Sequence, residues 1–425
     1  MDRISDLRHF LDYAHSVYHA VAALTEELKK AGYIQLSEAD EWNLQPGGKY
    51  YLTRNGSAVL AFRVPEVSPK GFMISAAHSD RPCFKVKENG VLSGAYTRLA
   101  VEKYGGMLIS PWLDRPLSVA GRVVVETEKG IETRLVDMDR DLLLMPNVAI
   151  HMNRNANDGY KWNPATDTIP LMGDKETKAF WEELEGLAGG KILGHDLYLY
   201  VRQKSAVWGM NEEFFSAQAI DDLECAWGCL RGFLQAKPTA SIPVLCVFDS
   251  EEVGSSSYQG AASDMLKNTI SRICKALGLD KKRQLARSFM VSADNAHALH
   301  PNHPELADSA NAPVMNGGVV VKFNANQKYT TDGVSGAVFR KICEKAGVPV
   351  QTYCNRADIA GGSTLGNISL SQVAVPCVDI GLAQLAMHSC YETAGVKDVS
   401  YLVDAMTAYY ATEVEVSDQG AICLK

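Results

Sequence analysis

The sequence predicts an α/β protein whose core is a mixed, largely parallel sheet covered by helices, with a β-rich domain inserted into it. From about residue 213 onward, helical and strand patterns alternate, which is typical of a parallel sheet. Between residues 86 and 212, short alternating strands are joined by glycine or charged turns. The 425 residues, 46% of them hydrophobic, are enough for two or three domains. We therefore expect a discontinuous α/β domain (1–85 and 213–425) and an inserted β-rich oligomerisation domain (86–212).

The N-terminal part of the chain combines a helix with strands. Apolar residues recur at helical spacing from Ile4 to Leu28, which predicts one amphipathic helix over the first 31 residues. A mixed strand region follows to about residue 85. Within the inserted segment, GRVVVETEKGIETRLVDM (121–138) predicts antiparallel strands joined by a short turn.

The C-terminal half supplies the alternating elements of the main sheet. Apolar runs of strand length are separated by segments with helical periodicity. The predicted helices are 222–236, 261–278, 333–346 and 398–413, and the predicted strands are 242–248, 289–293, 349–353 and 373–380.

Composition excludes several classes of protein. The formal net charge of −8 argues against a general nucleic-acid binder, which needs a basic surface. The longest apolar runs, such as Ile242–Phe248, are far shorter than the ~20 residues that span a bilayer. The charged N-terminal segment lacks the apolar stretch of a secretory signal. The ten cysteines form no C-x-x-C pair, which favours buried, reduced thiols. We expect a soluble, cytoplasmic protein with no nucleic-acid or membrane partner.

Acidic and histidine residues follow four short apolar runs that are predicted to be buried strands. They are His78 after GFMISAA, Glu251–Glu252 after IPVLCVFDS, Asp294 after FMVSA, and His388 shortly after VAVPCVDIGLAQLAM. The carboxyl ends of parallel strands border the ligand crevice of an open α/β sheet. These residues are therefore expected to converge on one crevice, although they lie far apart along the chain.

A fifth candidate, Asp221, lies at the start of a predicted helix, where a helix cap is the simpler explanation. Taken one by one, the other candidates also have structural explanations, as a core histidine, a turn former and a solvated glutamate pair. Together, two histidines and several carboxylates form a donor set for zinc, manganese or cobalt. They exceed the needs of one tetrahedral ion, which favours two ions bridged by a carboxylate. Neighbours on an extended backbone point to opposite sides, so one of Glu251 and Glu252 can bind metal while the other acts as a base.

Eleven segments match one metallopeptidase family in order along nearly the whole chain. They include YHAV (18–21), AAHSDRPCFKVK (76–87), IDDL (220–223), FDSEEVGSSSYQGA (248–261), SADNAHALHPNHPE (292–305) and LAMHS (385–389). On these segments the sequence resembles the M18 metallopeptidases, the aspartyl aminopeptidase family. The resemblance implies a zinc-exopeptidase fold of α/β/α type and an aminopeptidase that uses two divalent ions, zinc first, with manganese or cobalt as alternatives.

The resemblance also implies roles for single residues. Asp221 would bridge the two ions, His78 and Asp294 would complete one, and Glu252 and His388 would complete the other. By the same resemblance, Glu251 would be the general base that takes a proton from the attacking water and delivers it to the leaving amine.

Further roles concern assembly and substrate. The resemblance implies that His151 enters the active site of a neighbouring subunit, so that the enzyme works as a homo-oligomer, in this family a dodecamer. Lys322, Tyr329 and His297 match positions around the substrate pocket. The expected substrates are peptides with a free N-terminus. Acidic P1 residues are favoured, although neutral ones such as leucine are accepted in some members.

Two other functions remain open at this point. A related metal-dependent deacylase or carboxypeptidase-like hydrolase would need a cationic clamp for a substrate carboxylate, and N-acetylated substrates would distinguish it from an aminopeptidase. A non-catalytic oligomeric shell protein would be free to lose the catalytic set. Glu251 and all five ligand-type residues are present, which argues against the shell protein.

Overall fold

The computed structural model describes residues 2–177, 179–416 and 421–425. Its largest unit is a nine-stranded mixed sheet. Its four central strands, β13, β4, β14 and β18, run parallel. Both β13 and β4 are buried along their whole length, as expected for strands covered on both faces. In order across the sheet, the strands are β1 (Ile34–Gln35), β2 (Lys49–Arg54), β3 (Ala58–Arg63), β13 (Ile242–Phe248), β4 (Phe72–His78), β14 (Phe289–Ala293), β18 (Cys377–Gly381), β16 (Val319–Phe323) and β17 (Val350–Cys354).

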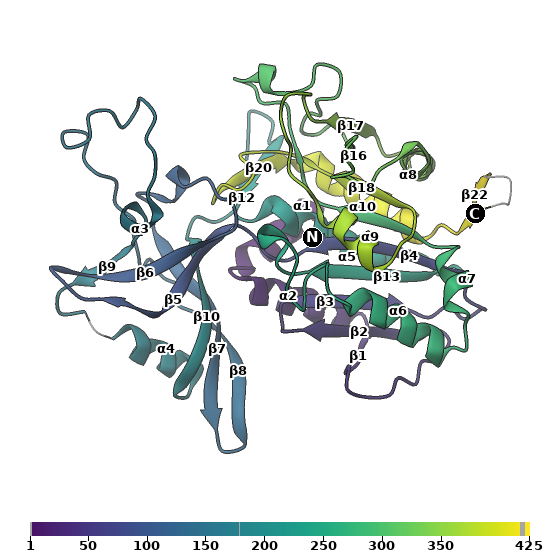
Figure 1. The fold of residues 1–425 in the computed structure, drawn as a ribbon, viewed down its shortest axis with the longest axis horizontal. Coiled ribbons are helices and arrows are strands. Elements are labelled where there is room, and N and C mark those ends of the chain that lie inside the picture. The colour runs from purple at the N-terminus through teal and green to yellow at the C-terminus, as the bar shows by residue number, and fades with distance from the viewer. Residues whose placement is uncertain (1, 178, 417–420) are drawn as a thin grey trace.

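Helices cover both faces of this sheet and complete an α/β/α architecture, which confirms the predicted fold class (Figure 1). The side chains of each helical layer join one face of the sheet in a separate apolar core. One layer contains α1 (Arg3–Tyr13), α2 (Val17–Lys30), α5 (Ile220–Gln235), α8 (Gly333–Ala346) and α10 (Val396–Tyr410). The other contains α6 (Met265–Ala276), α7 (Lys281–Leu285) and α9 (Leu365–Gln372).

The prediction of one helix over the first 31 residues is wrong. Helix α1 ends at Tyr13, and α2 begins at Val17. Ser16 between them has an extended backbone, and its hydroxyl accepts the N–H of His19. A serine N-cap of this kind starts a new helix inside a continuous apolar pattern.

Most elements of the C-terminal half lie where the sequence predicts them, and α8 has the predicted bounds. The strand expected at 373–380 is shorter, because β18 begins only at Cys377. Pro376 directly before it has no N–H to donate to a strand ladder. Helix α7 follows the predicted 261–278 region as a separate short helix.

A second sheet of six antiparallel strands lies beside the main sheet, at the left of Figure 1. Its hairpin of β7 and β8 pairs Thr127 with Gly130, which confirms the predicted antiparallel strands. The sheet has an apolar core of its own, to which Phe180 and Leu184 of α4 (Phe180–Ala188) contribute. In order, the strands are β8 (Gly130–Asp137), β7 (Leu117–Thr127), β10 (Ile192–Val201), β5 (Cys83–Leu92), β6 (Tyr96–Tyr104) and β9 (Leu171–Asp174), and α3 spans Pro164–Asp167.

Shorter strands complete the molecule. A five-stranded sheet has the order β11 (Ala206–Trp208), β12 (Phe214–Ala217), β20 (Glu392–Gly395), β19 (Ala383–Leu385) and β15 (Ala296–His297). Near the C-terminus, β21 (Val414–Val416) pairs with β22 (Ile422–Leu424). Within the described ranges, no helix combines the length and the apolar character needed to cross a membrane.

Candidate metal centre

The predicted ligand-type residues meet at the carboxyl edge of the central parallel strands. His78 is the last residue of β4, and Asp294 directly follows β14. Glu252 lies in the short 3₁₀ helix Glu251–Val253 after β13. Asp221 lies in the first turn of α5, where its backbone is not yet helical, and His388 follows β19. The convergence expected from the strand ends is thus present in the fold.

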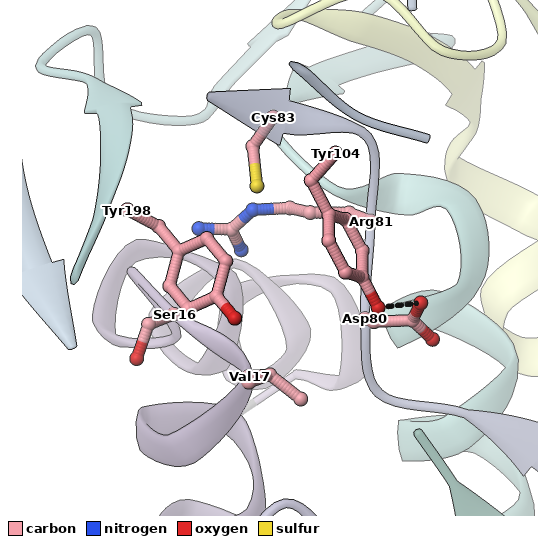
Figure 2. A pocket seen from close by; sticks show the side chains of 7 residues that line it. All are labelled: Ser16, Val17, Asp80, Arg81, Cys83, Tyr104 and Tyr198. Carbon is pink, nitrogen blue, oxygen red and sulfur yellow. Dashed lines mark hydrogen bonds between the residues drawn. The ribbon is translucent and has the colours of Figure 1, made fainter. Parts of the chain in front are cut away.

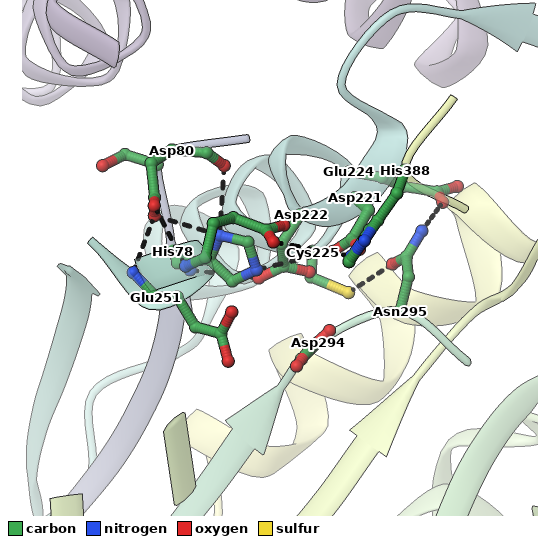
Figure 3. Close-up of polar contacts among 12 residues, drawn as sticks. His78, Asp80, Asp221, Asp222, Glu224, Cys225, Glu251, Asp294, Asn295 and His388 are labelled. Atoms are coloured by element: carbon green, nitrogen blue, oxygen red, sulfur yellow. Dashed lines mark hydrogen bonds and ion pairs between the residues drawn. The ribbon is translucent and has the colours of Figure 1, made fainter. Parts of the chain in front are cut away.

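The carboxylate of Asp221 lies between two imidazoles (Figure 3). Its Oδ1 is 3.4 Å from Nε2 of His78, and its Oδ2 is 3.5 Å from Nε2 of His388. The same nitrogen of His388 is 3.5 Å from Oε2 of Glu252. The donor atoms form three overlapping groups, each within 4.8 Å. One is His78, Asp221, Asp222 and Asp294, the second is His78, Glu251 and Glu252, and the third is Asp221, Glu252 and His388. Asp221 differs from the other shared residues because its two oxygens face different imidazoles, as the oxygens of a bridging carboxylate would.

Buried negative charge dominates the centre. Burial raises the pKa of Asp294 to about 6 and that of Glu252 well above its usual range. Burial also tends to raise the pKa of Asp221, but the facing imidazoles of His388 and His78 hold this pKa well below its usual value. Uncompensated carboxylates are costly to bury, so bound cations would stabilise the ionised form of this cluster.

The donor set fits divalent metal ions. Oδ1 of Asp221 and Oε1 of Glu252 are buried and make no hydrogen bond within the described structure, which leaves them free to bind a cation. Imidazole nitrogens and carboxylate oxygens together suit zinc, and they also suit manganese and cobalt. Nδ1 of His388 faces the carbonyl oxygen of Gly106, a contact that orients the ring with Nε2 toward Asp221.

The backbone of Glu251 and Glu252 differs from the prediction. The pair lies in a 3₁₀ turn that follows Ser250, whose φ is 65°, so the argument from an extended backbone is wrong. In a 3₁₀ helix the side chains of neighbouring residues still point in different directions, because each residue advances the helix by about a third of a turn. Burial, followed by the charges of neighbouring carboxylates, raises the pKa of Glu251 to about 8.

Sequence reasoning missed the residues that hold the ligands in place. Asp80 accepts the main-chain N–H groups of Glu251 and Glu252, each at 3.1 Å, and its own carbonyl oxygen is 3.1 Å from Nδ1 of His78. Tyr104 donates its hydroxyl to Asp80 beside a small cavity (Figure 2). The His-x-Asp spacing of residues 78–80 was the available signal for Asp80.

Two more acidic residues act on the backbone of the ligands. Asp222 accepts the N–H of His78 at 3.0 Å. Glu392 accepts the N–H of Asp221 at 3.0 Å and that of His388 at 2.7 Å. The contacts of Asp222 with His78 and of Glu392 with Asp221 could not be read from the sequence, because they join segments that are remote in the chain. Glu392 and His388 are only four residues apart.

The expected substrate-pocket residues lie in two different environments. Lys322 is 1% exposed, and its Nζ donates to the carbonyl oxygens of Asp294 at 2.7 Å and Asn295 at 3.2 Å. Tyr329 is buried with its ring 5.1 Å from this nitrogen. His297 instead lines an open cavity of about 320 Å³ that extends to Met387, the residue before His388.

His151 lies outside this cluster within one subunit. It is exposed on the long loop that leads from the second sheet toward α3. Exposed apolar side chains flank it on the same loop, namely Val148, Ile150 and Met152.

Comparison with known proteins identifies the family. The family model described as "Aminopeptidase I zinc metalloprotease (M18)" matches residues 10–410. A relative named "Probable M18 family aminopeptidase 2" from Clostridium novyi (strain NT) is 41% identical over 424 residues, which cover 96% of this chain and 98% of the relative. Its namesake from Pseudomonas aeruginosa (strain UCBPP-PA14) is 39% identical over 416 residues, with coverage of 95% and 96%.

Solved structures show the same fold. A chain of "Cryo-EM structure of the Ape4 and Nbr1 complex" has a TM-score of 0.92 and 34% identity, with 96% of this chain and 85% of that chain covered. The mApe1 dodecamer of S. cerevisiae has a TM-score of 0.85 and 26% identity, with coverage of 96% and 95%. Together with the buried histidine and carboxylate cluster, these findings show that the chain belongs to the M18 family of zinc metallopeptidases and is a metalloaminopeptidase.

Proposed function

We propose that this aminopeptidase uses two divalent ions, zinc in the first place, to remove the N-terminal residue from peptides. Asp221 would bridge the ions, with His78 and Asp294 completing one site and Glu252 and His388 completing the other. The observation that carries this assignment is the position of the Asp221 carboxylate, whose two oxygens face two different imidazoles.

The chain's own residues would move the proton. Ions bound in such a site polarise the substrate carbonyl and lower the pKa of water. Glu251 lies at the edge of the cluster, close to His78 and Glu252. We assign it the role of general base, which takes a proton from the attacking water and returns it to the leaving amine. Asp80 would hold Glu251 in place, because its carboxylate accepts the main-chain N–H of Glu251.

The inserted domain would serve assembly. His151 and its apolar neighbours are exposed on a loop, and His151 belongs to none of the donor groups among the described residues of its own subunit, which supports insertion of this loop into a neighbouring subunit. There His151 would stabilise the tetrahedral intermediate. By analogy with the mApe1 dodecamer, we propose a homododecamer for this chain as well.

The cavity beside His297 would receive the P1 side chain. Three imidazoles (His297, His300 and His303) and the guanidinium of Arg356 line it, together with apolar side chains such as Leu385. None of its described lining residues is acidic. Arg356 pairs with Asp358 and His303 pairs with Glu305, and burial lowers the pKa of His297, so the lining carries little uncompensated positive charge. The cavity therefore suits neutral P1 residues as well as the acidic ones that the family resemblance favours. Lys322 would contribute indirectly, because its Nζ donates to the carbonyl oxygen of Asp294 and so fixes this backbone.

A cytoplasmic location is consistent with the thiols. The ten cysteines are free, and eight of them are buried. Reduced thiols in this number suit a reducing compartment.

Initial rates on free-amine substrates with P1 Asp, Glu, Leu, Lys and Ala would test this function. The enzyme is assayed after chelation and again after addition of zinc, manganese or cobalt, with N-acetylated substrates as controls. We expect metal-restored cleavage of free-amine substrates only, fastest for Asp and Glu. Cleavage of the acetylated series would support a deacylase instead. No cleavage with any metal, by a folded and assembled protein, would contradict the proposal.

A further inference from the structure

Glu392 connects the main chains of two proposed ligands. Its Oε2 accepts the N–H of Asp221 at 3.0 Å, and its Oε1 accepts the N–H of His388 at 2.7 Å. Only 2% of Glu392 is exposed. It begins β20, which pairs with β12 on one side and β19 on the other, so its backbone is held within a sheet. One fixed carboxylate therefore sets the distance between two ligands from different elements.

A carboxylate is needed here because the two N–H groups lie in irregular backbone. His388 has φ 67°, in the left-handed region, and Asp221 follows Ala219 and Ile220 at the non-helical start of α5. Buried N–H groups without a partner are destabilising. Glutamate offers one acceptor oxygen to each group, whereas glutamine would turn an NH₂ group toward one of them.

The side chain of Glu392 is also connected to the end of β14, where Asp294 lies. Nε2 of Gln384 donates to Oε1 of Glu392 at 3.4 Å, and Oε1 of Gln384 accepts from Nδ2 of Asn295 at 2.6 Å. Asn295 directly follows Asp294. The network behind the metal centre thus joins the segments of Asp221, His388 and Asp294, although Glu392 contacts the main chain of only the first two.

We propose that Glu392 is a positioning residue for the metal site formed by Asp221, Glu252 and His388. This inference rests on the proposed two-metal centre. Replacing Glu392 by glutamine should misplace His388 relative to Asp221 and weaken that site. The site of His78 and Asp294 should change less, because Asp222 and Lys322 hold it through separate contacts. Loss of such an outer contact costs about 10–100-fold in metal affinity.

Zinc binding at buffered free-zinc concentrations would test this in the assembled enzyme, with the number of ions per subunit as the readout. We expect the wild type to bind two ions. Glu392→Gln should bind one ion with little change in affinity and the other about 10–100-fold more weakly. The matched control is Asp398→Asn, because Asp398 is a nearby buried carboxylate that likewise accepts two main-chain N–H groups, those of Asn316 and Gly318, neither of which is a proposed ligand. Its zinc titration should match the wild type.

Equal weakening of both ions, or an equal shift in Asp398→Asn, would overturn the inference. If Glu392→Gln does not assemble, Gln384→Ala decides, since it leaves Glu392 in place and removes its side-chain partner, together with the contact of Gln384 to Asn295. A weaker affinity for one of the two ions in Gln384→Ala would support the positioning role of Glu392. A zinc titration equal to that of the wild type would overturn this role. A wild type that binds a single ion would instead contradict the two-metal proposal itself.

Discussion

The hydroxyl of Tyr104 donates a hydrogen bond to the carboxylate of Asp80 across 2.8 Å. Tyr104 ends β6 of the second sheet, whereas Asp80 accepts the N–H groups of Glu251 and Glu252 at the edge of the main sheet. The second sheet thus supports the turn that carries the proposed base.

Removal of this hydroxyl should slow turnover. We expect Tyr104→Phe to lower kcat about tenfold with little change in KM, since a hydrogen bond to a charged group contributes about 1.5–3 kcal/mol. Steady-state kinetics would measure kcat and KM of the variant and of the wild type. Tyr198→Phe is the matched control, because Tyr198 lines the same cavity and its ring packs 5.9 Å from that of Tyr104. Equal effects of the two changes would argue against a specific role for the Asp80 contact.

The role of Glu251 predicts a separation of catalysis from metal binding. Glu251→Gln should keep its metal content and its assembly, while kcat falls by about 10²–10⁴-fold, the usual contribution of a general base. Glu252→Gln is the comparison and should lose metal, because Glu252 lies 3.5 Å from His388 in the proposed ligand set. Metal analysis and rate measurement on the same samples would check both. Loss of metal from Glu251→Gln would disprove its assignment as the base.

Supply of His151 across a subunit boundary can be tested by mixing two inactive variants. His151→Ala and Glu251→Gln should each be nearly inactive alone. When they are dissociated and reassembled together, the Glu251 of one variant and the His151 of the other meet in some active sites, and activity should return to a fraction of the wild-type rate. A mixture that is as inactive as its components would show that His151 acts within its own subunit or not at all.

The stability of the fold should depend on pH through His19. Burial lowers its pKa to about 4 from an ordinary value of 6.5. Between these values the unfolded chain binds the extra proton, so the free energy of unfolding falls as the pH falls. From pH 7 to pH 5 this group should remove about 2 kcal/mol. His19→Gln should show a correspondingly smaller loss in thermal unfolding. His9→Gln, on the exposed side of α1, should keep the wild-type pH dependence. The same pH dependence in His19→Gln and the wild type would contradict the assignment.

The sequence predicted the convergence of the ligand-type residues because each follows a strand or begins a helix whose direction the α/β pattern defines. His78 and Asp294 are examples, since each lies at the end of a buried parallel strand. The break at Ser16 was missed because the apolar spacing continues across it. The contacts of Asp80 with Glu251 and Glu252, and of Glu392 with Asp221, were missed for another reason, since they join side chains to main-chain atoms far away in the sequence. No local pattern records such a contact.

The spread of the proposed ligands along the chain has a consequence for biosynthesis. His78 emerges from the ribosome long before His388, because most of the sequence lies between them. An unfinished chain therefore lacks part of the donor set, and a finished but unfolded chain has its donors scattered. Hydrolytic capacity would arise only in the last step of maturation, so the fold itself protects the nascent chain and its neighbours from premature cleavage.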